Sequence, residues 1–237
     1  MENNIYSRTE SLIGKDSLEI LKKSKVIVFG IGGVGSFAVE SLCRCGIGEI
    51  SLVDFDTIDI TNINRQIHAM SNNIGKYKVD EMKNRIELIN PKIKVNIFKE
   101  KLDKNNVENF NLKYYDYVVD AIDIITSKIY LIKCCYENNI NVISAMGAGN
   151  KLDPTRFKVV DIYKTSGCPL ARVMRRELKK LGIKKLKCVC SDETSSGEVI
   201  ESYERRKSSP SSISFIPSTM GLIITSEVVK DLILWNK

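Results

Sequence analysis

The sequence predicts an α/β fold: a Rossmann-like, doubly wound and mainly parallel sheet with a C-terminal extension. Three observations predict this class. Short runs of β-branched and apolar residues alternate with helix-like segments as far as residue 149. The first run, 25–29, ends at a glycine-rich turn, and a helical segment starts directly behind that turn. Beyond residue 150 the pattern changes, so we expect a single domain over 1–237, with 1–150 as its core and 151–237 as the extension.

Each predicted element follows from the local composition. Runs rich in valine, isoleucine and aromatic residues predict strands at 25–29, 50–53, 93–98, 115–119, 141–145, 156–163 and 186–190. Apolar residues at helical spacing predict helices at 10–23, 34–45, 76–89, 105–110, 128–137, 169–181 and 218–234. The third of these helices is expected to end before Asn90, because a residue that precedes proline disfavours the helical conformation. Residues 191–215 are rich in serine and charge and are expected to form a loop.

The composition is that of an ordinary soluble globular protein, with 43% apolar and 27% charged residues. Seven cysteines and an N-terminus without an apolar signal core predict free thiols in a reducing compartment, the cytoplasm. No stretch of about 18 uninterrupted apolar residues is present, so no membrane span is expected.

The net charge of +7 favours a polyanionic partner such as nucleic acid, although a lysine-rich composition alone gives the same excess. The charge is concentrated in 172–187, where eight basic residues accompany a single acid, Glu177. The candidate contacts to nucleic acid are Arg172, Arg175, Arg176, Lys179 and Lys180. A solvated lysine-rich helix is the alternative interpretation of the same segment.

The glycine-rich turn has Gly30, Gly32 and Gly35 in the spacing G-x-G-x-x-G, and Gly33 adds a further glycine. Glycine permits a tight turn and lets backbone amides approach phosphate, while the N-terminus of the following helix favours an anion. Asp54 lies 24 residues after Gly30, at the end of the second predicted strand, where a carboxylate can accept ribose hydroxyls. NAD and ATP fit this pattern equally well, and a packed turn without a ligand is the remaining alternative.

The residues that follow Asp54 favour a triphosphate. The candidate nucleotide ligands in this stretch are Asp56, Asn62, Arg65, Gln66 and Lys78. A triphosphate carries more charge than a dinucleotide and typically needs cationic side chains and a metal ion. Asp123, just past a predicted strand end, is the candidate ligand of magnesium (Mg2+). The alternatives are that Lys78 is a solvated helix charge and that Asp123 is a helix N-cap.

Together these residues resemble the ThiF/MoeB superfamily, the bacterial relatives of the ubiquitin-activating enzymes, from about residue 6 to the last helix. A finer resemblance is to the branch of tRNA threonylcarbamoyladenosine dehydratases, called TcdA or CsdL. It rests on Asn-Arg-Gln-Ile-His-Ala at 64–69, Asp-Ala-Ile-Asp at 120–123, Gly-Ala-Gly at 147–149, Asp-Pro-Thr at 153–155 and Cys-Val-Cys-Ser at 188–191, which Glu193 follows.

The resemblance implies an adenylating enzyme that binds ATP at the glycine turn, with Mg2+ and a monovalent cation as further ligands. The implied substrate is tRNA carrying threonylcarbamoyladenosine next to the anticodon, bound in part by 151–237. Its side chain is closed into a ring while ATP is consumed and water is formally lost. A homodimer is also implied, in which Arg8 of the pattern Tyr6-Ser7-Arg8 reaches the ATP of the neighbouring subunit. A cysteine desulfurase or sulfur-acceptor system is a further implied partner.

The expected chemistry begins with attack of the threonyl carboxylate on the α-phosphate, which gives an acyl adenylate. Arg65, Lys78, Arg8 of the neighbouring subunit and Mg2+ on Asp123 are expected to stabilise the phosphate charge. A nitrogen of the same side chain then attacks the acyl carbon, and its proximity makes a strong base unnecessary. The only histidine, His68, is therefore expected to be structural.

Cys188 matches a cysteine of the branch that is suspected of acting on the activated acyl group or of accepting sulfur. The basic stretch that ends at Lys187 is expected to lower the pKa of its thiol. The alternatives are that Cys188 is merely packed and that Cys190 is the reactive thiol.

Two other functions compete with the dehydratase. The first is adenylation of the C-terminus of a ubiquitin-like sulfur carrier, but enzymes of that kind usually hold a zinc ion with two Cys-x-x-Cys pairs, and this chain has none. The second is an NAD-binding oxidoreductase or a nucleotide sensor, against which the absence of an evident hydride-transfer machinery counts.

Overall fold

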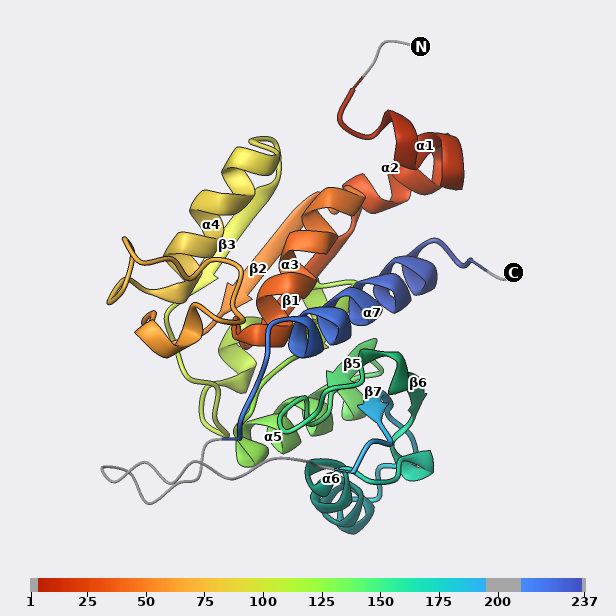
Figure 1. Cartoon of the computed structure of the whole chain (residues 1–237). Coiled ribbons are helices and arrows are strands. Elements are labelled where there is room, and N and C mark those ends of the chain that lie inside the picture. The colour runs from red at the N-terminus through yellow and green to blue at the C-terminus, as the bar shows by residue number, and fades with distance from the viewer. Residues whose placement is uncertain (1–3, 195–209, 236–237) are drawn as a thin grey trace.

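The computed structural model describes residues 4–194 and 210–235, and its strands form one seven-stranded sheet (Figure 1). The strands are β1 (Lys25–Phe29), β2 (Glu49–Val53), β3 (Lys94–Phe98), β4 (Tyr117–Asp120), β5 (Val142–Ala145), β6 (Phe157–Asp161) and β7 (Lys187–Ser191). The α-helices are α1 (Ser7–Ile13), α2 (Lys15–Lys23), α3 (Gly33–Cys45), α4 (Lys78–Ile89), α5 (Ile125–Glu137), α6 (Pro169–Lys180) and α7 (Phe215–Leu232). Short 3-10 helices are η1 (Ile60–Asn62), η2 (Val107–Phe110), η3 (Leu112–Tyr114), η4 (Pro154–Arg156) and η5 (Ile162–Lys164).

The strand order is β3-β2-β1-β4-β5-β7-β6, and every neighbouring pair is parallel except β7 and β6. The chain runs outward from β1 to β3 and then returns to add β4 and β5 on the other side of β1. The carboxyl ends of β1 and β4 therefore flank the point where the direction of winding reverses, which is where open α/β sheets bind ligands. The predicted Rossmann-like, mainly parallel sheet is confirmed.

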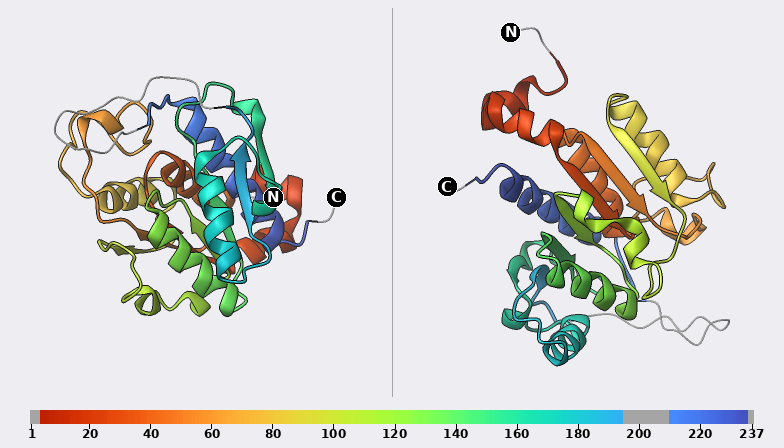
Figure 2. Two further views of the ribbon diagram at one scale, coloured as in Figure 1. Left: turned by 90° about the horizontal axis from the view of Figure 1, so that it is seen from below. Right: turned by 180° about the vertical axis from the view of Figure 1, so that it is seen from behind.

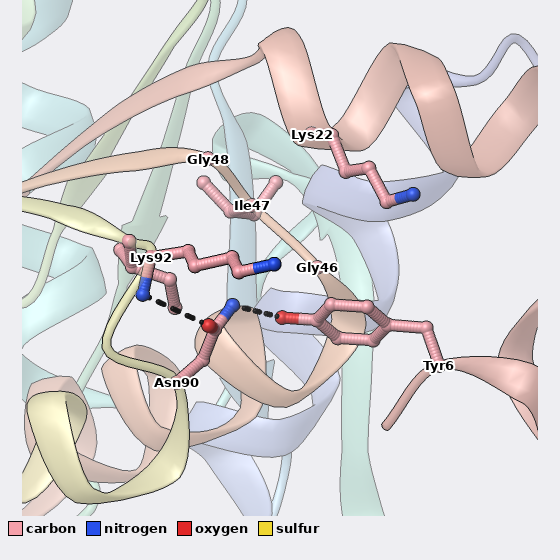
Figure 3. Close-up of a pocket in the computed structure, with 8 residues that line it drawn as sticks. Tyr6, Lys22, Gly46, Ile47, Gly48, Asn90 and Lys92 are labelled. Atoms are coloured by element: carbon pink, nitrogen blue, oxygen red, sulfur yellow. Dashed lines mark hydrogen bonds between the residues drawn. The ribbon is translucent and has the colours of Figure 1, made fainter. Parts of the chain in front are cut away.

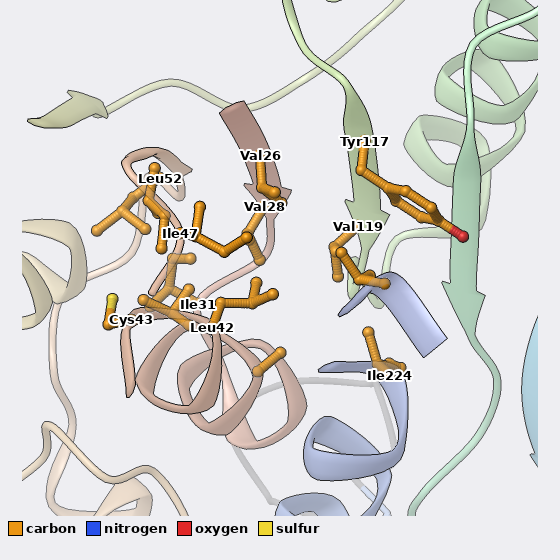
Figure 4. Close-up of a cluster of buried hydrophobic side chains, with 14 of the residues drawn as sticks. Val26, Val28, Ile31, Leu42, Cys43, Ile47, Leu52, Tyr117, Val119 and Ile224 are labelled. Atoms are coloured by element: carbon orange, nitrogen blue, oxygen red, sulfur yellow. The ribbon is translucent and has the colours of Figure 1, made fainter. Parts of the chain in front are cut away.

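Helices cover both faces of the sheet (Figure 2). The cores beneath them differ: α3, α4 and α7 pack on one face, and α5, α6 and the turn η2 pack on the other. Strand β1 serves both cores, because successive side chains of a strand point to opposite faces. Val26 and Val28 face α3, where they lie near Leu42 (Figure 4), whereas Ile27 and Phe29 face the opposite core.

The chain beyond residue 150 completes this sheet. Strand β7 pairs with β5, and β6 forms the antiparallel edge beyond it. Helix α7 packs along α3, and a Cβ on Gly221 would lie only 2.4 Å from the carbonyl oxygen of Val34. Thr225 supports the same contact, since its hydroxyl donates to the carbonyl oxygen of Ala38 at 3.1 Å. The extension thus covers the helix that follows the glycine turn.

Several predicted boundaries are wrong for identifiable reasons. The helix expected at 10–23 is two helices, because Gly14 has φ 85° and ψ 159° and interrupts the helical backbone. The helix expected from residue 76 begins at Lys78, because Tyr77 is extended and pairs with Thr57. The strand expected at 156–163 ends at Asp161, whose carboxylate caps the turn η5.

The loop expected at 191–215 includes residues 195–209, which lie outside the described residues, and α7 already begins at Phe215. Within 4–194 and 210–235, no helix is both long enough and apolar enough to cross a membrane.

Candidate functional site

The glycine turn lies at the carboxyl end of β1, between the ends of β2 and β4. Gly30 has φ 86°, and a Cβ there would lie 2.5 Å from the carbonyl oxygen of Ala121, directly after β4. A Cβ on Gly35 would lie 1.8 Å from the carbonyl oxygen of Gly30, so no side chain fits. Gly32 is the N-cap of α3, and a Cβ there would meet no described atom within 4 Å. The turn therefore presents the uncapped N-terminus of a 13-residue helix, which suits phosphate.

Asp54 follows β2 and touches the same turn. One carboxylate oxygen accepts from the amide of Ile31 at 2.6 Å, and the other accepts from the amide of Asp56 at 2.9 Å. Burial raises the pKa of Asp54 above its ordinary value, while the charge of Lys78 and the two amides oppose that rise. The carboxylate is thus fixed where the ribose of a nucleotide on this turn would lie.

Lys78 is the first residue of α4 and is almost completely buried. Its Nζ lies 2.8 Å from an oxygen of Asp56, and its amide donates to the carbonyl oxygen of Asp56 at 3.1 Å. The side chain of Asp56 is about half exposed, so the ion pair lies at the protein surface, and the charge of Lys78 acts on nearby Asp54. Burial and position both argue against Lys78 as a solvated helix charge.

The loop between β2 and α4 carries the other predicted ligands. Asn62 ends the turn η1, and its side-chain oxygen accepts from the amide of Asp59 at 3.2 Å. Arg65 donates to the carbonyl oxygen of Thr61 at 2.7 Å, and its Cγ lies 3.5 Å from the position that a Cβ on Gly33 would take. The aliphatic part of the Arg65 side chain therefore lies against the start of α3.

Gln66 is buried beside this loop, and its side-chain oxygen has no hydrogen-bond partner among the described residues. The structure thus brings together the glycine turn, Asp54, Asp56, Arg65 and Lys78.

His68 is enclosed behind the same loop. It is 1% exposed, and neither ring nitrogen has a hydrogen-bond partner in the part of the chain that the structure describes. Burial first, and then the charges of Lys78 and Arg85, lower the pKa of His68 to about 4. The imidazole is therefore neutral and remote from solvent at neutral pH, which agrees with a structural role.

We expect the burial of His68 to make the fold sensitive to acid. Between pH 6.5 and about 4 the unfolded chain binds a proton that the folded chain does not, so stability falls as the pH falls through this window. The free energy of unfolding should lose about 1.4 kcal/mol per pH unit there and nothing above pH 6.5. Urea denaturation of the wild type and of His68→Phe between pH 4 and 8 measures the difference. Equal pH profiles for the two proteins would contradict the expectation.

The end of β4 carries two aspartates with different surroundings. Asp123 is exposed between β4 and α5 and makes no hydrogen bond or ion pair within the described residues. Asp120 is fully buried: its carboxylate lies 2.7 Å from Nζ of Lys128 and accepts from the hydroxyl of Ser144 at 2.7 Å. Its other oxygen accepts from the amide of Ile122 at 3.2 Å, which fixes the chain that leads to Asp123. The sequence pattern did not predict this buried group.

The cysteines differ from expectation. Cys188 is fully buried on β7, its thiol donates to the carbonyl oxygen of Val160 at 3.4 Å, and burial raises its pKa to about 12. The prediction of a lowered pKa for Cys188 is therefore wrong. The neighbouring thiols of Cys168 and Cys190 titrate together: the proximity of Cys190 lowers the pKa of Cys168 and raises that of Cys190. The sulfur of Cys168 also caps α6 by accepting from the amide of Ala171 at 3.5 Å.

The sequence signal for Cys168 was Cys-Pro at the start of a basic helix, since proline favours the first helical position and a helix N-terminus stabilises a thiolate.

The basic helix α6 exposes four of its five predicted contacts: Arg172, Arg176, Lys179 and Lys180. Arg175 is half-buried and donates to the carbonyl oxygen of Thr165 at 2.8 Å and to its hydroxyl. Arg175 therefore ties α6 to the preceding loop and is less available for a contact with nucleic acid. Arg176 and Lys180 share the carboxylate of Glu177.

Arg8 lies far from the glycine turn of its own chain. It is exposed on α1, whose neighbour Tyr6 contacts the carbonyl oxygen of Cys43 in the last turn of α3. The glycine turn is at the other end of α3, and a 13-residue helix is about 20 Å long. An arginine side chain cannot span that length, and Figure 1 shows α1 at the distal end of α3.

Comparisons with known proteins agree with this geometry. The model of the ThiF family matches residues 6–236. A tRNA threonylcarbamoyladenosine dehydratase of Bacillus subtilis is 47% identical over 96% of this chain and 94% of its own length. The Escherichia coli protein of the same name is 41% identical over 73% of this chain and 65% of its own length. A crystal structure of the E. coli enzyme in complex with ATP is similar with a TM-score of 0.90 and 34% identity, over 97% of this chain and 93% of that one. With its glycine turn, its acid after β2 and a family match over nearly the whole length, this chain belongs to the ThiF family.

Proposed function

We propose that this protein is an ATP-dependent dehydratase that cyclises the threonylcarbamoyladenosine next to the anticodon of tRNA. The observation that carries the proposal is the 47% identity with a tRNA threonylcarbamoyladenosine dehydratase along 96% of this chain. The site agrees with it, because two cationic side chains, Arg65 and Lys78, stand beside a phosphate-binding turn and an acid suited to ribose.

The chemistry follows from the arrangement of the chain's own residues. The glycine turn holds the phosphates, Asp54 orients the ribose, and Arg65 and Lys78 neutralise the charge that develops as the threonyl carboxylate attacks the α-phosphate and pyrophosphate leaves. The urea nitrogen of the same side chain then attacks the acyl carbon, and AMP departs with one carboxylate oxygen. ATP thus becomes AMP and pyrophosphate, and the nucleoside loses one water.

Asp123 is the residue that we assign to Mg2+. Its carboxylate is exposed just past β4 and has no partner among the described residues, so it is available to a hard cation. No cluster of three or more candidate ligands occurs in the described ranges, so a magnesium ion there would complete its coordination with water and phosphate oxygens. When bound, the ion supplies charge stabilisation at the phosphates. A monovalent cation enters the proposal through the resemblance alone.

The test is incubation of the purified protein with ATP, Mg2+ and tRNA that carries threonylcarbamoyladenosine. Nucleoside mass analysis should show the loss of 18 Da, the mass of one water, about one AMP per modified nucleoside, and no reaction without ATP. AMP formation that depends on a ubiquitin-like protein, with tRNA unchanged, would instead support the sulfur-carrier alternative. All seven cysteines lie within the described ranges, and no three of the candidate metal ligands there cluster, so these residues offer no four-thiolate set of the kind common in that alternative.

The proposal includes a homodimer in which Arg8 acts on the neighbouring subunit's ATP. The length of α3 separates Arg8 from its own glycine turn, and α1 contains no buried residue. A groove of about 360 Å³ between α1, α3 and α7 is lined largely by apolar side chains, among them Leu12, Leu222 and Val229. A second copy of the chain would cover this groove and bring α1 with it.

The proposed tRNA contact is the exposed face of α6. We expect Arg172→Gln combined with Lys179→Gln to weaken tRNA binding and to reduce the slope of log K against log salt by about 0.7–0.9 for each phosphate that is no longer neutralised. Fluorescence anisotropy between 50 and 200 mM salt measures the slope. The control is Lys83→Gln with Lys92→Gln, which removes equal charge at α4 and beyond its end. An equal weakening in both double variants would show only a general charge effect and contradict the assignment.

The sulfur-transfer partner, a cysteine desulfurase or its acceptor, enters the proposal through the resemblance alone. Cys168, Cys188 and Cys190 are all buried, and burial raises the pKa of Cys188, so none of the three thiols lies open to a partner in this structure. The seven free thiols also support the cytoplasm, a reducing compartment, as the proposed location.

A further inference from the structure

We propose that Tyr6 is a positioning residue: its hydroxyl fixes the chain at the start of α1 so that Arg8 is correctly presented to the partner subunit's ATP site. The inference rests on the proposed homodimeric function. It adds the residue whose hydrogen bonds fix the position of Arg8.

Of the residues of helix α1, Ile13 packs against the main core and is only partly buried, so the position of the helix also depends on the residues that flank it. It is seven residues long, none of them is buried, and it is joined to α2 through Gly14. Figure 1 shows it standing out from the body of the molecule beside α2. Tyr6, its N-cap residue, is by contrast only 8% exposed. The position of Arg8, two residues later, therefore depends on how firmly Tyr6 is held.

The hydroxyl of Tyr6 makes two hydrogen bonds to the body of the protein. It accepts from the side-chain amide of Asn90 at 2.8 Å and donates to the carbonyl oxygen of Cys43 at 3.2 Å. Figure 3 shows the ring directed across a pocket toward Asn90. The ring packs beside Gly46, since a Cβ there would lie at ordinary van der Waals distance, 3.5 Å, from it. Burial raises the pKa of Tyr6 above its ordinary value, so the donor proton is retained.

Packing alone does not fix the ring. A cavity of about 240 Å³ adjoins it and is lined by Lys22, Gly46, Gly48, Asn90 and Lys92 among others. A ring that borders an open cavity can shift unless polar contacts hold it, and the two hydrogen bonds of the hydroxyl are those contacts.

The two partners of the hydroxyl belong to the two helices that carry the ATP ligands. Cys43 lies in the last turn of α3, whose first residues form the glycine turn, and Asn90 is the C-cap of α4, whose first residue is Lys78. Tyr6 thus ties α1 to the far ends of both helices. In a two-fold dimer, any shift of Tyr6 is transmitted to Arg8 and thus to the site of the partner subunit.

The test uses mixed dimers, because a residue that acts through Arg8 must act on the other subunit's site. Tyr6→Phe removes both hydrogen bonds and keeps the ring, so we expect about a tenfold loss of kcat/KM for AMP formation in the homodimer. Lys78→Ala inactivates the site that its own chain supplies but keeps Tyr6 and Arg8. Dimers of the two chains, isolated with two different tags, contain one site with Lys78 and an intact Arg8 from the other chain.

We expect such Tyr6→Phe/Lys78→Ala dimers to recover about half of wild-type activity, as one of two sites is whole. If Tyr6 served only its own subunit, the mixed dimer would retain about one twentieth, half of the tenfold-weakened value, and the inference would be overturned. Arg8→Ala/Lys78→Ala dimers test the proposed function separately. Their failure to recover would overturn the trans role of Arg8 itself.

A matched control is Tyr115→Phe. It also removes a buried hydroxyl, which donates to the hydroxyl of Ser51 at 2.8 Å, but it lies outside α1 and its anchor. Mixed dimers of Tyr115→Phe with Lys78→Ala should not exceed half the activity of the Tyr115→Phe homodimer. Recovery there would show that complementation arises without Arg8 and would contradict the assignment to Tyr6.

Discussion

Replacement of Lys128 by methionine is expected to lower the free energy of unfolding by about 3–5 kcal/mol, because it leaves a buried charge without its partner. Both side chains of the Lys128–Asp120 pair are 0% exposed, and Nζ lies 2.7 Å from the carboxylate and 3.1 Å from the hydroxyl of Ser144. Urea denaturation at pH 7, followed by circular dichroism, measures the loss.

The control for this prediction lies on the same helix. Lys133→Met breaks an exposed pair with Glu137 at 3.7 Å, for which we expect at most about 1 kcal/mol. The double variant Lys128→Met with Asp120→Leu removes both charges and should recover most of the lost stability. If the free energy of unfolding falls by less than about 1 kcal/mol in Lys128→Met, the variant does not leave an unpaired buried charge and the prediction is wrong. Failure of the double variant to recover would assign the effect to packing rather than to charge.

This buried group shows what the sequence could not predict. Asp120 lies opposite Ser144 in the parallel pairing of β4 with β5, and Lys128 reaches both from the first turn of α5. Three elements and one strand register must be known before these residues form a group. Asp54 and the glycine turn were predictable because each follows from its place at a strand end, where a Rossmann-like sheet binds nucleotides.

The error at Cys188 has a similar origin. Lys187 precedes it in sequence and suggested an electropositive site, but neighbours on a strand point to opposite faces of the sheet. Lys187 points toward α7, where it lies 2.7 Å from Asp231, while Cys188 is buried in the opposite core with α6. Linear proximity therefore indicated the wrong thiol, and the Cys168–Cys190 contact, between a helix N-cap and a strand, could be found only in three dimensions.

The break of the first helix at Gly14 is a third case. The apolar spacing through 10–23 is continuous, and a glycine within a helix is tolerated at a cost of about 1 kcal/mol, so the pattern favoured one helix. The observed φ of 85° arises because α1 turns away from α2, which remains packed on the core through Leu18 and Leu21. The break at Gly14 is thus set by tertiary packing rather than by local propensity.

Gly35→Ala is expected to abolish ATP binding at concentrations near the wild-type Kd, with at least a hundredfold loss of affinity, or about 2.7 kcal/mol. The added methyl group would lie 1.8 Å from the carbonyl oxygen of Gly30, and 3.3 Å from Cβ of Ala121. Because the obstacle is backbone, the turn itself must move, and the amides that face the phosphates move with it. The same displacement should cost about 1–3 kcal/mol of stability.

Gly32→Ala separates binding from folding within the same turn. A Cβ on Gly32 has no described atom within 4 Å, and its φ of −87° suits any residue, so stability should change by less than about 0.5 kcal/mol. The methyl group nonetheless enters the space that the phosphates would occupy, so ATP affinity should fall at least tenfold. Isothermal titration calorimetry and urea denaturation of both variants give the comparison. Wild-type ATP affinity in both variants would contradict phosphate binding at this turn. Weakened ATP binding in Gly35→Ala alone would show that the turn affects the site only indirectly and that Gly32 does not face the phosphates.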